Sequence, residues 1–77
     1  MQEKLDNIII EILDLDEGEL SDDLTPETAE YWDSLNHLRM ISAIEQAFDI
    51  KLTMEEIQSI ESIGELRQTI ARHLGTP

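Results

Sequence analysis

Ser34 is the side chain of this sequence whose position best suits chemistry. It lies in the run Trp32-Asp33-Ser34-Leu35, where a long connection meets the start of an amphipathic helix. Unpaired backbone N–H groups and the positive end of the helix dipole lie at such a start. A phosphate attached to the Ser34 hydroxyl would therefore be favoured electrostatically. The alternative interpretation is that Ser34, or Asp33, only caps the helix, which is a common role for both residue types.

A Ser–His nucleophile pair is the second chemistry to consider, because Ser34 and His37 are three residues apart on one helical turn. No Gly-x-Ser-x-Gly turn surrounds Ser34 in the sequence, and no third residue that would orient the imidazole is apparent. A chain of 77 residues also has little room for a cleft that encloses a substrate. We therefore expect a non-catalytic protein, with His37 partly exposed on its helix and near the phosphate.

The acidic run from Asp14 to Glu19 resembles a calcium-binding loop only superficially. Counted from Asp14, Gly18 occupies the fifth place instead of the sixth, and Thr25 stands at the twelfth, where a bidentate glutamate is required. We expect no dedicated metal site. Crowded carboxylates here would still attract divalent cations weakly, as relief of charge.

Composition narrows the classes of partner. Eighteen Asp and Glu against five Lys and Arg leave a formal net charge of −13. Nucleic acid and anionic membrane surfaces both require cationic side chains, so neither is an expected partner. A protein with a basic patch is the expected partner, met through electrostatic steering.

Length and residue usage indicate one domain over residues 1–77. The sequence contains no cysteine, hence no disulfide, which fits the reducing cytoplasm. The N-terminus shows no signal peptide, and the longest apolar run, Ile8-Ile9-Ile10, is far too short to span a bilayer. We expect a cytoplasmic monomer that does not insert into membranes.

Apolar spacing predicts helices throughout and no strands. The first helix covers about residues 3–14, and a long connection follows over residues 15–33. Thr25, Pro26 and Glu27 are typical of a helix start, so one short turn near 26–30 is expected. The apolar residues of the connection should fasten it to the core; they are Leu20, Leu24, Tyr31 and Trp32.

The second helix is expected from about Ser34 to Phe48 and has two faces. One face carries the core residues Met40, Ile41, Ile44 and Phe48. The outer face carries Leu35 and Leu38, followed by Ser42. Thr53 with Glu56, and Ser62 with Glu65, predict capped starts for a short helix and a last helix, which Gly75 ends. The expected fold is all-α: a small bundle of three longer helices and one short one, with a long ordered loop between the first two.

The stretch WDSLNHLRMISAIEQAFDIKLTMEEI resembles the acyl carrier protein family, and the likeness extends over nearly the whole chain. The resemblance implies that Ser34 accepts 4′-phosphopantetheine from coenzyme A, preceded by the acid Asp33. It also implies that Met40, Ile44 and Phe48 surround an acyl pocket. The partner face that it implies consists of Leu35, Leu38, Arg39, Ser42 and Glu45.

By this resemblance the chain carries acyl groups as thioesters for synthases and transferases of fatty-acid, polyketide or related biosynthesis. The implied partners are a phosphopantetheinyl transferase and acyl-loading and elongating enzymes with basic patches. Arg39 departs from the family's fatty-acid members, which usually carry an acid there, so we expect a specialised carrier. Two alternatives stay open: an aminoacyl or peptidyl carrier, and a cofactor-free acidic interaction module.

Overall fold

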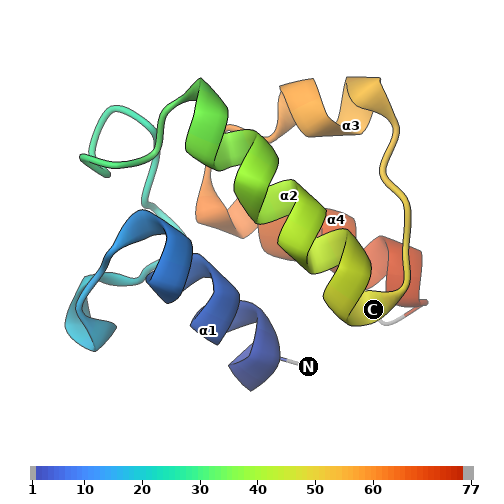
Figure 1. The fold of residues 1–77 in the computed structure, drawn as a ribbon, viewed down its shortest axis with the longest axis horizontal. Helices are drawn as coiled ribbons and strands as arrows, with labels where there is room; N and C mark the ends of the chain where they lie inside the picture. The colour runs from blue at the N-terminus through green and yellow to red at the C-terminus, as the bar shows by residue number, and fades with distance from the viewer. Residues whose placement is uncertain (1, 76–77) are drawn as a thin grey trace.

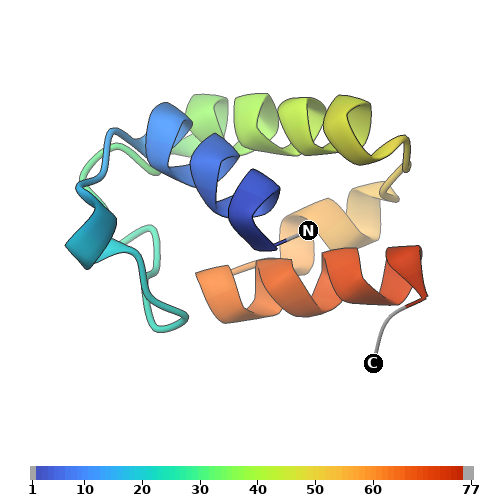
Figure 2. The ribbon, with the colours of Figure 1, turned by 90° about the horizontal axis from the view of Figure 1, so that it is seen from below.

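The computed structural model describes residues 2–75 and consists, over that range, of α-helices joined by ordered connections. The elements are α1 (Gln2–Leu13), the 3₁₀-helix η1 (Glu17–Glu19), α2 (Ser34–Phe48), α3 (Met54–Ser59) and α4 (Ile63–Leu74). Figures 1 and 2 show α1 and α2 together on one side of the bundle, α4 on the other, and short α3 between α2 and α4. The predicted all-α bundle is confirmed. None of the helices described is long and apolar enough to cross a membrane.

The core is formed by one apolar stripe from each of the three longer helices. The fully buried side chains are Leu5, Ile9 and Leu13 of α1, Met40, Ile41 and Ile44 of α2, and Ile63, Leu66 and Ile70 of α4. Burial of each such side chain contributes about 1.5–3 kcal/mol. Phe48 was expected in the same core, but it is only half-buried and packs against the core edge.

Helix ends follow the local signals in the sequence. The Thr53 side chain accepts a hydrogen bond from the Glu56 N–H, and the Glu56 carboxylate accepts one from the Thr53 N–H, which confirms the predicted capping box of α3. Ser62 likewise caps α4 by accepting from the Glu65 N–H. Gly75 ends α4 with a left-handed φ of 75°, a conformation that glycine adopts without steric penalty.

The connection between α1 and α2 is ordered by its own hydrogen bonds. The predicted turn near 26–30 exists as a single turn, in which the Ala29 N–H donates to the Thr25 carbonyl (2.8 Å). Leu24 and Trp32 pack inward as expected, and Trp32 is only 3% exposed. The expectation for Tyr31 was wrong: it is 48% exposed, because adjacent residues of this turn face opposite ways and Trp32 takes the inward position.

The start of α4 fastens this connection to the bundle. Its first N–H groups, those of Ile63 and Gly64, donate to the carbonyls of Leu24 and Asp22 (both 3.0 Å). A Cβ at Gly64 would lie 3.3 Å from the Asp22 backbone oxygen, so the missing side chain allows the close approach. Arg67 of α4 pairs with Asp22 and with Asp6 of α1 (2.9 Å each). The long loop is therefore held in place at the end of the bundle where α2 begins.

Candidate functional site

Ser34 is the first residue of α2, and Asp33 takes the role of cap. Asp33 has an extended backbone, and its carboxylate accepts a hydrogen bond from the Asn36 N–H at 2.9 Å. The Asn36 side chain donates to the Tyr31 carbonyl at 2.8 Å, which fixes the end of the loop. Asp33, and not Ser34, therefore caps α2, and the Ser34 hydroxyl is left exposed.

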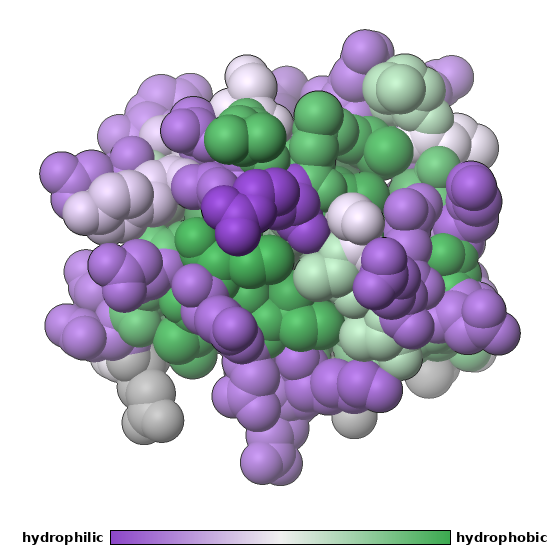
Figure 3. All heavy atoms as spheres, in the orientation of Figure 1, coloured by the Kyte–Doolittle hydropathy of each residue, from purple (hydrophilic) through white to green (hydrophobic). Residues whose placement is uncertain are grey.

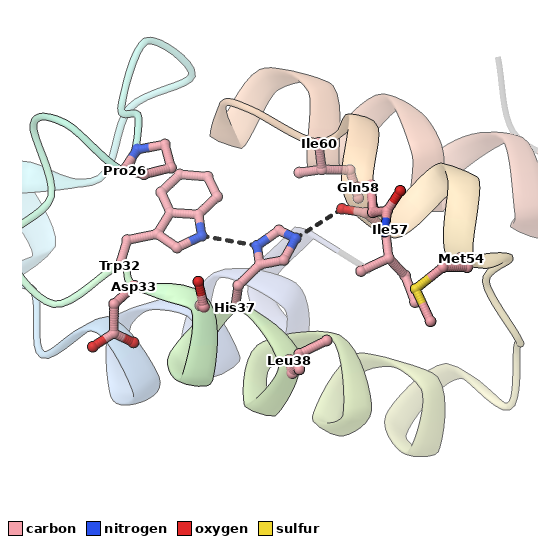
Figure 4. Close-up of a pocket in the computed structure, with 10 residues that line it drawn as sticks. Pro26, Trp32, Asp33, His37, Leu38, Met54, Ile57, Gln58 and Ile60 are labelled. Atoms are coloured by element: carbon pink, nitrogen blue, oxygen red, sulfur yellow. Dashed lines mark hydrogen bonds between the residues drawn. The ribbon is translucent and has the colours of Figure 1, made fainter.

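Beside Ser34 lies an open cleft of about 570 Å³ between the start of α2 and α3. Its walls are mostly apolar, and Figure 4 shows Trp32 and Pro26 on one side and Met54 and Ile57 on the other. The residues that line it are Pro26, Trp32, Asp33, Ser34, His37, Leu38, Met54, Ile57, Gln58 and Ile60. A flexible group attached to Ser34 thus has an apolar surface within immediate reach.

His37 joins the two walls of this cleft. The Trp32 indole Nε1–H donates to His37 Nδ1 at 2.9 Å, and His37 Nε2 lies 2.8 Å from the Ile57 carbonyl oxygen. Because an indole only donates and a carbonyl only accepts, these partners require the neutral imidazole with its proton on Nε2. The Ile57 carbonyl belongs to the last turn of α3, where no later N–H continues the helix. His37 therefore caps the C-terminal end of α3 and, through the same ring, fixes Trp32 on the opposite side of the cleft.

This arrangement excludes a Ser–His nucleophile pair. The Nδ1 lone pair of His37 is occupied by Trp32, and its Nε2 proton is directed at Ile57. Neither nitrogen is free to take a proton from Ser34. The geometry suits a serine that another protein modifies.

The predicted partner residues lie along α2. Leu35 and Leu38 are 66% and 52% exposed, and Arg39 and Ser42 are exposed beside them. Glu45 is half-buried, and its carboxylate accepts a hydrogen bond from the Leu52 N–H at 2.8 Å. Exposed Met54, across the cleft from Leu38, was not predicted as a site residue. It stands one residue after the α3 cap, and its place opposite α2 depends on tertiary packing.

Comparisons with known proteins agree with this geometry. Residues 3–70 match the family described as "Phosphopantetheine attachment site". A solved protein described as an acyl carrier protein from Mycobacterium tuberculosis is 26% identical, with a TM-score of 0.81 over 91% of this chain and 93% of that one. The solution structure of a holo acyl carrier protein from Geobacter metallireducens is also 26% identical, with a TM-score of 0.83 over 95% of this chain and 84% of that one.

The fold is a helical bundle, an exposed serine begins one of its helices, and the sequence matches an attachment-site family. Together these features define a carrier protein, a non-catalytic class that binds its cofactor covalently. The chain belongs to the phosphopantetheine attachment-site family. Its cofactor is phosphopantetheine, and membership implies modification by a phosphopantetheinyl transferase.

The residues present fit that group. The exposed Ser34 hydroxyl would provide the attachment atom, and the Ser34 and Leu35 N–H groups lie in the first turn of α2, where the helix dipole favours a phosphodiester. The adjacent cleft offers apolar contact to the rest of an attached arm.

Proposed function

We propose that Ser34 is the attachment site and that the cargo of this carrier is an acyl group. The observation that carries the proposal is the exposed Ser34 hydroxyl at the first position of α2, with the capping role taken by Asp33. Ser21, Ser42, Ser59 and Ser62 lack this combination of a preceding cap, a helix start and the cleft.

In this function the protein binds and orients the arm. The N–H groups at the start of α2 stabilise the phosphodiester charge, and the Trp32–His37–Ile57 hydrogen bonds connect the two walls of the cleft. When attached, phosphopantetheine supplies a terminal thiol that holds the cargo as a thioester. The chain has no cysteine, so that thiol would be the sole one in the protein.

An acyl cargo is supported by two features. Aminoacyl carriers often have glycines before the modified serine, whereas this chain has Tyr31-Trp32-Asp33. Both solved relatives reported above are described as acyl carrier proteins. An aminoacyl or peptidyl cargo is the second candidate within the same family.

The attachment site is tested by mass spectrometry after incubation with coenzyme A and a broad-range phosphopantetheinyl transferase. Wild type should gain the mass of one phosphopantetheinyl group, and Ser34→Ala should gain none while keeping its helical circular dichroism. Ser21→Ala is the matched control, because Ser21 is an exposed serine outside the predicted partner face, and it should be modified as wild type is. Modification of Ser34→Ala at the wild-type rate would end the assignment.

The cargo is tested on the modified protein. Acyl-activating ligases and malonyl transferases should load the arm, and amino-acid-activating enzymes should not. Loading by the amino-acid-activating enzymes alone would establish the aminoacyl alternative and leave Ser34 as the attachment site.

A further inference from the structure

The outer face of α2 differs in charge from the rest of this acidic protein. Eighteen acidic residues occur in the sequence, yet Glu45 is the sole one between positions 34 and 48. Its carboxylate is half-buried and bonded to the Leu52 N–H. The helix that begins at Ser34 therefore presents no free carboxylate along its outer face.

Arg39 provides the charge of this face. It is exposed, and its guanidinium donates to the Asn36 side-chain oxygen at 3.3 Å. Within the part of the chain that the structure describes, no carboxylate lies within ion-pair distance of Arg39. Arg39 is therefore not paired with the neighbouring carboxylates Glu30 and Glu45. Its guanidinium is open to a carboxylate of another protein.

Apolar surface surrounds Arg39. Leu35 and Ser42 share its side of α2, because positions three and four apart are neighbours on a helix. Exposed Leu38 is three residues after Leu35 and four before Ser42, so it extends the same surface to one side of Arg39. A groove of about 430 Å³ between α1 and α2 adjoins Arg39, lined by Ile8, Glu11, Ile12, Ser42, Ala43 and Gln46, with Glu11 its one acid. Figure 3 shows apolar residues gathered over the middle of the face where α1 and α2 lie in front, with hydrophilic residues around them.

An enzyme that acts on a group attached to Ser34 comes close to α2, because Ser34 is the first residue of that helix. A basic side chain opposite Arg39 would be repelled, and a carboxylate would be attracted. We propose, resting on the carrier function proposed above, that the enzymes serving this carrier dock on α2 with a carboxylate opposite Arg39 and an apolar contact on Leu35 and Leu38. The proposed partner is therefore acidic opposite Arg39, whereas the carrier's net charge of −13 predicts a basic patch on the partner.

The proposal is tested by a charge swap. The probe is a discrete ketoacyl synthase with a basic patch at its active-site entrance, together with a variant in which lysines of that patch are replaced by glutamate. Dissociation constants are measured by calorimetry at low salt with carriers that all contain Ser34→Ala. The dissociation constants then do not depend on phosphopantetheine. Failure of phosphopantetheine attachment at Ser34 is detected separately, by the mass-spectrometry experiment described above.

Carriers that retain Arg39 should bind the charge-reversed synthase about threefold to tenfold more tightly than the native synthase, and Arg39→Glu should invert that order. Lys51→Glu is the control, since it changes net charge equally on an exposed connection beyond α2, and it should keep the order. The difference should shrink at high salt, where screening is stronger. If Arg39→Glu and Lys51→Glu shift binding equally, or neither shifts it, the proposed contact is wrong.

Discussion

His37 links parts of the chain that are far apart in sequence. Its ring is hydrogen-bonded to Trp32 on one side and to the Ile57 carbonyl, twenty residues later, on the other. The Trp32 and His37 rings are also nearly parallel, with centroids 6.0 Å apart. Loss of the imidazole would leave a buried indole N–H and a helix-end carbonyl without partners.

We predict that His37→Ala lowers the free energy of unfolding by about 2–3 kcal/mol, because an unsatisfied buried donor costs about 1–3 kcal/mol. Urea denaturation followed by circular dichroism measures the change. His37→Gln should recover part of the loss, since its amide can accept from Trp32 and donate to Ile57. The neighbouring Leu38→Ala should cost under about 1 kcal/mol, because Leu38 is 52% exposed. Equal losses in His37→Ala and Leu38→Ala would contradict the bridging role.

For individual residues, the sequence predicted the features that depend on neighbours in the chain. Ser34 at a helix start and an acid before it were read from adjacent residues, and the structure has both. The sequence left open whether Ser34 or Asp33 caps α2, because both side chains are suitable. It could not predict the His37–Ile57 bond, which depends on how α3 packs against α2.

Among the elements, α3 is the shortest α-helix described and depends strongly on its ends. Glu56 completes the capping box with Thr53 and also pairs with His73 of α4 at 2.9 Å. The backbone N–H of Thr53 and the hydrogen bond with His73 together lower the pKa of the Glu56 carboxyl below its ordinary value. One side chain thus links the start of α3 to the last turn of α4.

This coupling predicts a dependence of stability on pH. A carboxyl whose pKa is lowered by folding stabilises the native state above its ordinary value of 4.5, and that stabilisation is lost as pH falls through the lower folded-state pKa. Glu56→Gln keeps an oxygen for Thr53 but removes the charge. We predict that wild type is more stable than Glu56→Gln near pH 6, and that the two unfolding free energies converge in acid. A difference that stays constant from pH 6 to strongly acidic solution would contradict this prediction.

Helix bounds were largely predictable because capping residues act locally. The predicted helix over residues 3–14 is α1 (Gln2–Leu13), and the predicted start and end of α2 are those observed. The connection was less predictable, because it has no hydrophobic period. Sequence could not decide which of Tyr31 and Trp32 faces inward, and it did not indicate η1 or the bonds from Ile63 and Gly64 to the loop.

Among the carboxylates whose side chains the structure describes, most face solvent without a paired cation. Within the described range the ion pairs involve Asp6, Asp22 and Glu56, while the segment 14–23 and positions 55–56 crowd further acids together. Mutual repulsion of these charges opposes the compact state.

We predict that sodium chloride raises the melting temperature by roughly 5 °C, since screening over a Debye length of about 10 Å in 0.1 M salt relieves this repulsion. Millimolar magnesium or calcium should raise it further. Differential scanning calorimetry of wild type and of Asp14→Asn/Asp23→Asn provides the comparison, and the variant should respond less to salt. A melting temperature that neither ion changes would mean that the carboxylates are too dispersed to oppose folding.

The position of Trp32 has an optical consequence. It is the single tryptophan of the chain, it is buried beside Ser34, and its indole nitrogen is bonded within the wall of the cleft. The ultraviolet emission of Trp32 therefore reports on the surroundings of the proposed attachment serine, Ser34. We expect attachment of an arm, entry of cargo into the cleft and its release to an enzyme each to change those surroundings, so the unlabelled protein's own fluorescence should follow these steps in real time.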